Sequence, residues 1–405
     1  MFKTKVMLTI TTGKPACEIR TPPRRLNRFC VACDMSEEES DTAKLLKQYE
    51  YYIVEPNIQA IKQYRKQYSG DFFRFCIQLN DEDYQTKMNS MEKVRKIIMK
   101  YRSWRFELFP SGSTVTGLAT KGSDLDLILW CPDAQTIFYD EETAVFNILR
   151  LVRHFLLIDV EIRDELDNVC YVEAKVPILK IKFQGGLSID LSCCVAMFIS
   201  GVLNSYLIRG FTLWDAKVAP LCVLIKEWAR CHGIKNSTNG GFNSYALVLL
   251  IIHFLQCVAN PPILPNLPKL FPKMYGLEVD SKFLLSEILS SNKKPIPYDR
   301  GGKLSVEQNH QSLAELFVLF LDYYSNFDFE HNYICMRDAS VKLRRRNNNM
   351  SKPDVWTAVF IRDPVDNHNP GRTVRDIDYL QAGMRSRIWA VVKVGILGLS
   401  EIVAS

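Results

Sequence analysis

Two aspartates separated by a single residue stand at the head of an apolar run, where their carboxylates could do chemistry. Asp124 and Asp126 open a segment that is wholly apolar from Leu127 to Trp130. Residues i and i+2 of a β-strand project from the same face, so both carboxylates face one side while Leu125 and Leu127 face a core. Two like charges held together on such a strand are costly unless a cation offsets them. Because oxygen ligands with room for water and phosphate suit Mg²⁺, the pattern predicts a magnesium site.

Two further segments favour a metal site over the chance Ser-Asp-x-Asp of a surface turn. Upstream, Gly112 and Ser113 offer a tight turn with free backbone N–H groups and a hydroxyl, a concavity that accepts phosphate oxygens. Downstream, Asp190 alternates with Ile189 and Leu191, so its carboxylate projects from the strand face opposite these core residues. A two-metal site needs more oxygens than one aspartate pair supplies, and a neighbouring strand could place Asp190 beside that pair. Taken singly, Asp190 also fits an exposed strand position.

A sheet must position these side chains, and the chain before residue 200 has an α/β pattern. We expect amphipathic helices over residues 51–67, 83–100 and 141–157, and strands over residues 106–109, 124–130, 159–163, 173–183 and 187–193. Residues 110–113 indicate a break. The predicted fold class is α+β, with a small mixed sheet and a second, mainly helical domain.

The helical domain is expected after residue 200, where the strand patterns mostly stop. Long apolar helical patterns cover residues 217–233, 244–258 and 312–324, and proline-rich loops cover residues 260–272 and 292–297. The predicted organisation is a poorly ordered leader over residues 1–45, an α/β domain over 46–200 whose first helix could pack on the second domain, a helical domain over 201–385 and a tail over 386–405.

Composition and charge exclude several classes of protein. The chain has 405 residues, a formal charge of +6 and 47% hydrophobic residues, which fits two or three soluble domains and excludes a small disulfide-stapled module and a disordered chain. The longest apolar stretch, residues 246–258, contains His253 and Gln256 and is shorter than the roughly 20 residues of a membrane-spanning helix. Twelve cysteines without a framework spacing indicate reduced thiols and a cytoplasmic protein. Cys30 and Cys33 have the spacing of half a zinc site, but no second pair follows.

The segment from about residue 51 to residue 378, which contains Gly112, Ser113 and the three aspartates, resembles the nucleotidyltransferases of the DNA polymerase β superfamily. Within it, the chain is similar to the RNA 3′-terminal nucleotidyltransferases, which include terminal uridylyltransferases, also called poly(U) polymerases, and cytoplasmic poly(A) polymerases. Residues 311–324 and 327–329 resemble the poly(A)-polymerase-associated segment that completes the helical domain of that family. The resemblance implies an active site in the cleft between the two domains.

The resemblance also assigns catalytic roles to the residues above. The family's Gly-Ser motif falls on Gly112 and Ser113, and its three aspartates fall on Asp124, Asp126 and Asp190. These aspartates would be the catalytic residues and the metal ligands, with Mg²⁺, or Mn²⁺ in its place, as the cofactor. The substrates implied are a nucleoside triphosphate and the 3′ end of an RNA.

Five residues of the helical domain match positions that hold the nucleotide in this family. The resemblance places Asn204 on the ribose 2′-hydroxyl, Lys226 and Arg230 on the triphosphate, Ser244 on the phosphates and Tyr245 on the base. Lys226 and Arg230 are spaced i to i+4 and therefore share one helix face. The family usually has lysine at the second place, so Arg230 keeps the charge but changes its geometry. Stacking on Tyr245 is chemically reasonable because every base has a π-face.

The choice of nucleotide is expected to depend on His368, in a loop that resembles the family's base-recognition segment. Uridine-preferring members have a histidine before the asparagine, and an imidazole could donate to uracil O4 and crowd out adenine. One residue fewer separates Asp363 and Pro364 from His368 than in those members, a spacing closer to adenine-adding ones. The sequence therefore favours UTP, with a poly(A) polymerase using ATP as the alternative. An inactive scaffold of the same fold is a third interpretation, and the intact aspartates argue against it.

Recognition of the RNA itself has weaker signals. Residues 342–346 form the densest basic cluster and are a candidate RNA contact, although such a run is more often a solvated loop. The sequence has no RNP-type strand, KH loop or complete zinc knuckle. We therefore expect an RNA-binding protein partner to choose the target, and no membrane association.

Overall fold

The computed structural model describes residues 81–102, 104–120, 122–136, 140–174, 176–196, 199–275, 309–344 and 357–393. They all belong to one compact unit within residues 38–405. The expected leader, the helix over residues 51–67, the Cys30 and Cys33 pair and the loop at 292–297 lie outside these described residues.

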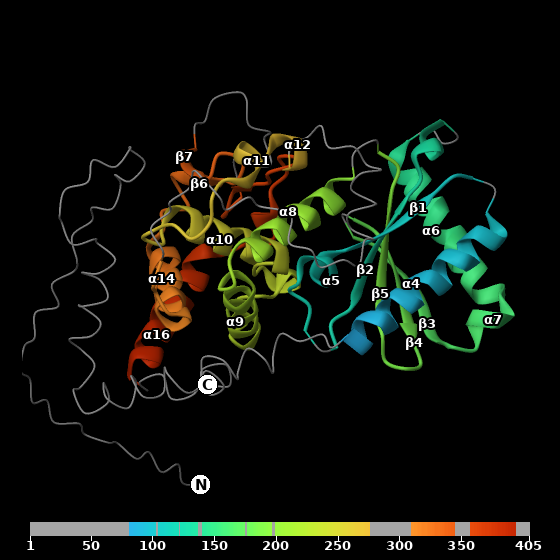
Figure 1. The fold of residues 1–405 in the computed structure, drawn as a ribbon, viewed down its shortest axis with the longest axis horizontal. Helices are drawn as coiled ribbons and strands as arrows, with labels where there is room; N and C mark the ends of the chain where they lie inside the picture. Colours follow the sequence, from blue (N-terminus) through green and yellow to red (C-terminus); the bar gives the residue numbers. More distant parts are fainter. Residues whose placement is uncertain are drawn as a thin grey trace, which may run out of the picture. The chain divides into compact units, whose positions relative to one another are not determined.

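A five-stranded mixed sheet forms the first part of the described chain (Figure 1). Its strands are β1 (Glu107–Ser111), β2 (Leu125–Trp130), β3 (Leu166–Val172), β4 (Ile178–Phe183) and β5 (Ser188–Cys194). Their order across the sheet is β1-β2-β5-β4-β3, with β2 and β5 parallel and the other neighbours antiparallel. The mixed sheet agrees with the predicted fold class.

Two long helices cover the apolar face of this sheet. Helices α4 (Asp81–Tyr101) and α6 (Glu141–Ile158) share a buried core with β2, β4 and β5. Leu125, Leu127 and Leu129 of β2 belong to that core. Because strand residues alternate between faces, Asp126 projects from the opposite face. Burial of the leucines therefore decides which way the carboxylates point.

The strand expected over residues 159–163 is wrong, because a short helix, α7 (Val160–Arg163), occupies it. Asp159 is fully buried and its side chain accepts a hydrogen bond from the Glu161 backbone N–H at 2.9 Å. The same carboxylate pairs with Lys100 Nζ at 2.7 Å. Polar and apolar residues alternate over residues 159–163, as in a strand, but the segment is only a helix-capping aspartate and one helical turn. The strand expected at 173–183 is confirmed only in its second half, as β4 (Ile178–Phe183), and β3 (Leu166–Val172), which ends just before this range, was not expected.

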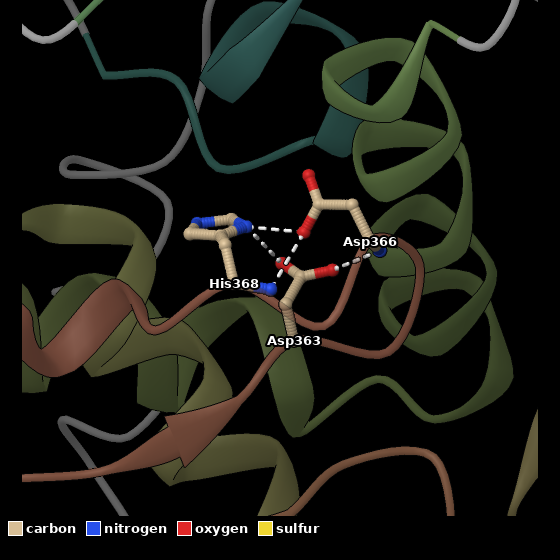
Figure 2. Close-up of side chains that lie close together, drawn as sticks. All are labelled: Asp363, Asp366 and His368. Carbon is tan, nitrogen blue, oxygen red and sulfur yellow. Dashed lines mark hydrogen bonds and ion pairs between the residues drawn. The ribbon is translucent and has the colours of Figure 1, made fainter. Parts of the chain in front are cut away.

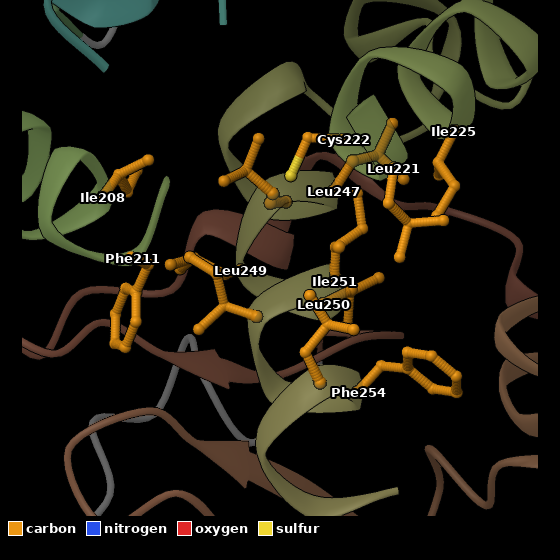
Figure 3. Packing of buried hydrophobic residues seen from close by; sticks show 14 of the residues in the cluster. Ile208, Phe211, Leu221, Cys222, Ile225, Leu247, Leu249, Leu250, Ile251 and Phe254 are labelled. Atoms are coloured by element: carbon orange, nitrogen blue, oxygen red, sulfur yellow. The ribbon is translucent and has the colours of Figure 1, made fainter. Parts of the chain in front are cut away.

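The second part of the described chain is mainly helical. Its long helices are α8 (Ser200–Trp214), α9 (Val218–Cys231), α10 (Ser244–Cys257), α14 (Leu313–Asn326) and α16 (Ile377–Lys393). Figure 3 shows the centre of this core, where Leu247 and Ile251 of α10 pack near Leu221 of α9 and Phe211 of α8 lies close by. Helix α10 is apolar on nearly every side because it is buried on nearly every side. No helix in the described ranges is long and apolar enough to span a bilayer.

A three-stranded sheet also lies in this helical part, where strand patterns were expected to stop. It consists of β6 (Asn332–Cys335), β7 (Ser340–Leu343) and β8 (Ile361–Arg362) in the order β7-β6-β8. Strands of two to four residues are too short to show a periodic signal. The remaining short elements are α5 (Gly112–Thr116), α11 (Leu267–Leu270), α12 (Pro272–Tyr275), η1 (Pro132–Thr136), η2 (Ser237–Asn239) and η3 (Pro370–Thr373). Helices α11 and the start of α12 lie within the expected 260–272 loop, and α16 continues past the expected domain end at residue 385.

The buried His253 of α10 is expected to make the protein less stable in acid. The Tyr324 hydroxyl donates to the Leu250 carbonyl at 2.8 Å, so it accepts from His253 Nδ1, also at 2.8 Å. His253 Nε2 then has no partner among the described residues, and burial lowers the pKa of His253 to about 3. The unfolded chain binds a proton below about pH 6.5 that the folded chain does not, so stability is lost as the pH falls.

We therefore expect the wild-type protein to lose about 2 kcal/mol more stability than a His253→Gln variant between pH 7 and pH 5. Urea unfolding at the two pH values measures this difference. Equal losses in the two proteins would contradict it.

Candidate active site

The three predicted aspartates meet on one face of the large sheet. Asp126 of β2 and Asp190 of β5 are directly paired in the register of the two parallel strands, and Asp124 precedes β2 by one residue. The pKa of Asp126 is raised to about 6, first by burial and then by the charges of Asp190 and Asp124. The three carboxylates therefore act on one another electrostatically, as residues of a single site do.

Glycine is required at position 112 because the backbone there touches this site. Residues 110–113 do not form the expected break, because β1 continues through Ser111 and α5 begins at Gly112. Gly112 has a φ of +63°, and a Cβ on it would lie 2.0 Å from Asp126 Oδ2. A hydrogen bond from the Ser113 backbone lowers the pKa of Asp126, against the raising effects. Both residues of the predicted Gly-Ser turn thus lie against Asp126.

Ser205, which the sequence did not indicate, makes a structural contact with the glycine-serine turn. The Gly112 backbone N–H donates to Ser205 Oγ at 3.0 Å, and Ser205 Oγ donates to the Gly201 carbonyl at 2.8 Å. Thr212, later on the same helix, donates to the Thr116 carbonyl at 2.8 Å. These bonds fasten α5 to α8, so the turn that faces the aspartates is held by both parts of the chain.

Two lysines that the sequence reasoning also missed flank the aspartates. Lys180 of β4 is paired with Asp190 in the sheet register, and its Nζ lies 2.8 Å from Asp190 Oδ1 and 3.3 Å from Asp124 Oδ2. Lys87 of α4 is almost fully buried, and its Nζ donates to Ser123 Oγ at 2.9 Å. The alternation of residues 178–183 could have marked Lys180 as facing away from the core, but only the register brings it to the aspartates.

The residues of this site fit a divalent cation. Three carboxylates supply the oxygen ligands that Mg²⁺ prefers, and the Lys180 ammonium already bridges Asp124 and Asp190 where a cation would be attracted. Burial is the first cause of the raised pKa of Asp126, and the charges of Asp190 and Asp124 come next, so a cation among the three carboxylates would relieve their repulsion. Asp124, Asp126 and Asp190 are therefore the residues that would hold the metal.

A second group of polar residues surrounds Asp363, directly after β8. Asp363 is fully buried and accepts hydrogen bonds from Tyr245 Oη at 2.7 Å, Asn204 Nδ2 at 3.1 Å and the Val365 backbone N–H at 2.8 Å. Burial, and next the charge of Asp366, raise the pKa of Asp363. Asp363 thereby joins α8, α10 and the loop, and it aligns the two side chains expected to hold the ribose and the base.

His368 lies in the same group, as Figure 2 shows. Its Nδ1 is paired with Asp366 Oδ1 and lies 3.5 Å from Asp363 Oδ2. The His368 and Tyr245 rings are 17° from parallel with centroids 6.4 Å apart. One ligand atom each of Asp363, Asp366 and His368 lies within 4.8 Å of the others, so these three could also hold a metal ion. The hydrogen bonds to Tyr245 and Asn204 account for Asp363 without one.

The two basic residues of α9 are placed differently from one another. Lys226 is half-buried, and its pKa is lowered first by burial and then by the charge of Lys235. The charge of Asp126 is among those that oppose this shift. Arg230 is exposed, and its Nε donates to Glu227 Oε1 at 2.9 Å and Oε2 at 3.0 Å. Ser244 is the first residue of α10 and is half-buried. Lys226 is thus less exposed than Arg230, which is engaged on the surface with Glu227.

We expect Lys226→Ala to raise the KM for the nucleotide at least about tenfold, because a half-buried cation beside an anionic ligand has no substitute. Arg230→Ala should change KM by less than about threefold, because exposed ion pairs contribute little. Steady-state kinetics at varied nucleotide concentration compare the two variants. A larger effect at Arg230 than at Lys226 would contradict this assignment.

The basic cluster at residues 342–346 is largely engaged in structure where it is described. Lys342 pairs with Asp338, and Arg344 donates to the backbone carbonyls of Asn332 at 3.2 Å and Thr357 at 2.8 Å. Residues 345 and 346 lie outside the described residues. Arg344 therefore holds the small sheet and the segment before β8 together, a role that the sequence did not indicate.

Taken together, a mixed sheet with aspartates on adjacent parallel strands, a glycine-serine turn against them and a helical domain beside them define a nucleotidyltransferase of the polymerase β type. Comparisons with known proteins agree. Residues 69–212 match the family model for the central palm domain of the mitochondrial-like poly(A) RNA polymerase, and residues 312–369 match that for the Cid1 family poly A polymerase.

Curated proteins similar in sequence are also named poly(A) RNA polymerases. The chain is 31% identical to the Poly(A) RNA polymerase gld-2 homolog B of Drosophila melanogaster over 67% of its own length and 20% of that relative. It spans 48% to 59% of the vertebrate GLD2 relatives that it matches. Its fold is similar to that of the GLD-2/RNP-8 complex structure (TM-score 0.64, 24% identity, 86% of this chain and 98% of that one) and of the Cid1 poly(U) polymerase (TM-score 0.57, 21% identity, 82% and 93%). The chain belongs to the RNA 3′-terminal nucleotidyltransferases of the DNA polymerase β superfamily.

Proposed function

We propose that this chain is a template-independent nucleotidyltransferase that adds adenylates from ATP to the 3′ end of RNA. The observation that carries the proposal is the row formed by Asp126 and Asp190 on adjacent parallel strands, with the Gly112 backbone against Asp126. Such a row of carboxylates is costly in a protein unless it serves a cation and a phosphate ligand.

The chain's own residues can bind and orient a nucleotide beside this row. Asn204 is buried, and its Nδ2 is committed to Asp363, so its Oδ1, which has no partner among the described residues, is free to accept from a ribose 2′-hydroxyl. Tyr245 offers a ring face to the base, and Lys226 offers its charge to the triphosphate. Metal ions bound to the aspartates would polarise the primer 3′-hydroxyl and neutralise the triphosphate.

The preference for adenine is supported by the hydrogen bonding of His368. Its Nδ1 faces the carboxylates of Asp363 and Asp366, so Nδ1 carries a proton. In the neutral ring, Nε2 is then an acceptor, which matches the N6 amine of adenine and not the O4 of uracil. The relatives named above are poly(A) RNA polymerases, which agrees with this choice rather than with the expected UTP.

Uridylate addition is the second candidate. A His368 ring that carries its proton on Nε2 would donate from Nε2 to uracil O4. The Cid1 structures similar in fold belong to a poly(U) polymerase.

The test is primer extension on RNA with each of the four triphosphates supplied separately with Mg²⁺. We expect ATP to be used at least about tenfold better than UTP, and the ratio to fall in a His368→Ala variant. A preference for UTP that disappears in His368→Ala would establish the second candidate. Failure to bind any triphosphate with Mg²⁺ would instead support the interpretation as an inactive scaffold of the same fold.

We further propose that an RNA-binding partner chooses the RNA. Solved structures similar in fold are described as complexes of GLD-2 with RNP-8 and with GLD-3, which supports a partner protein. Tailing by the isolated chain without regard to RNA sequence would agree with this proposal, and tight intrinsic selectivity would contradict it.

A further inference from the structure

Two lysines flank the aspartates, and the atoms that they contact differ in kind. Lys180 projects from β4 on the same face as Asp190, its neighbour in the register on β5. Lys87 reaches in from α4. Both amines lie within electrostatic reach of Asp124, and neither lysine was part of the expected site.

The ion-pair partners of Lys180 are the expected metal ligands themselves. Its Nζ lies 2.8 Å from Asp190 Oδ1 and 3.3 Å from Asp124 Oδ2, and its side chain is about one quarter exposed. The ammonium therefore neutralises two carboxylates at a position that a divalent cation would also seek. Ligands already paired with an ammonium must release it before both can face a metal ion.

The acceptors of Lys87 are neutral oxygens. Its Nζ donates to Ser123 Oγ at 2.9 Å, Thr114 Oγ1 at 3.3 Å and the Asp124 backbone carbonyl at 3.4 Å. These contacts tie α4 to α5 and to the turn that leads into β2. A metal ion on the aspartate side chains competes for none of these oxygens.

We propose that Lys180 is a resident counter-cation that a divalent metal must displace, whereas Lys87 is a permanent positioning residue that holds Asp124 in place for that metal. This inference rests on the metal site of the proposed function. It predicts that removing the two lysine charges shifts metal affinity in opposite directions. A general effect of lost positive charge would shift both in the same direction.

The test is Mn²⁺ binding to the metal-free full chain, followed by electron paramagnetic resonance of the free ion, with no turnover. We expect Lys180→Met to tighten binding roughly tenfold, because a competing unit charge is removed from two ligands. Lys87→Met should weaken binding by at least about threefold, because Asp124 loses its support. Lys93→Met is the matched control, since Lys93 also lies on α4 but is exposed and pairs with Glu165.

A second readout is the melting temperature in EDTA. Lys180→Met should melt below the wild type in EDTA and gain more from added Mn²⁺, because its carboxylates are left without a counter-charge. If Lys87→Met does not fold, Lys87→Arg and Thr114→Val test the same contacts more mildly, and both should weaken Mn²⁺ binding.

Tightening in both lysine variants, or weakening in both, would overturn the inference. Wild-type protein that binds no Mn²⁺, or binding unchanged by Asp126→Asn, would instead count against the proposed function.

Discussion

Asp126→Asn is expected to reduce nucleotide addition by about three orders of magnitude or more while the protein stays folded. Asp126 lies between the Gly112 backbone and Asp190, so its charge cannot be replaced by another carboxylate. Carboxylates that act as one unit lose nearly all activity when one is removed. Single-turnover extension of an RNA primer measures the loss. Activity within about tenfold of the wild type would refute the assignment.

The same variant should be more stable than the wild type at alkaline pH without metal. The pKa of Asp126 is raised from 3.8 to about 6 in the folded protein, so the folded state binds a proton more tightly than the unfolded state. Wild-type stability therefore falls as the pH rises from about 4 to about 6 and stays lower above that range. The shift corresponds to at most about 3 kcal/mol.

Urea unfolding in EDTA at pH 4 and pH 8 tests this effect. Asp126→Asn should exceed the wild type at pH 8 and match it more closely at pH 4. Asp164→Asn is the control, because Asp164 is largely exposed. A variant that loses activity and stability together at pH 8 would indicate a structural role for Asp126 instead.

Gly112→Ala is expected to lower activity by at least about a hundredfold. The new Cβ would lie 2.0 Å from Asp126 Oδ2, a separation that real atoms cannot keep, so either the turn or the carboxylate must move. A displacement of about 1 Å at a reacting centre costs on the order of a hundredfold in rate. The positive φ of +63° adds a backbone cost of roughly 1 kcal/mol.

Gly122→Ala separates these two effects. Gly122 has a φ of +78° with nothing within 4 Å of an added Cβ, so the alanine there brings only the backbone cost. We expect this control to lose stability but to retain activity within about threefold. Primer extension together with thermal melting compares the two variants. Equal loss of activity at the two glycines would show that backbone strain, and not contact with Asp126, is responsible.

Much of the large sheet could be predicted because its strands carry a strong local pattern. Leu125, Leu127 and Leu129 alternate with Asp126, and burial of the leucines determines the direction of the carboxylate. The register of β5 against β2 had no such signal, yet it decides that Asp190 lies beside Asp126. Short segments were not predicted correctly. The strand expected at 159–163 is a helix, and nothing in the sequence indicated β6, β7 and β8.

The nucleotide side of the site shows the same division. Tyr245 and His368 were singled out by resemblance, but Asp363, which links Tyr245, Asn204 and His368, was seen only as part of a loop spacing. Arg230 was expected on the triphosphate by resemblance to the family, and its i to i+4 spacing from Lys226 agreed with that role. Its pairing with Glu227 depends on side-chain rotamers, which helical spacing alone does not determine.

By itself, the amino-acid sequence determined the residue types of the site, the face of the strand from which Asp126 projects and the helical nature of the second domain. These depend on periodicity and on burial of neighbouring apolar residues, which are local properties of the chain. Only the tertiary structure decided that Lys180 and Lys87 reach the aspartates and that Asp363 gathers the nucleotide-facing residues. Those contacts join segments far apart in the chain, and their geometry depends on strand register and helix packing, which no short stretch of sequence encodes.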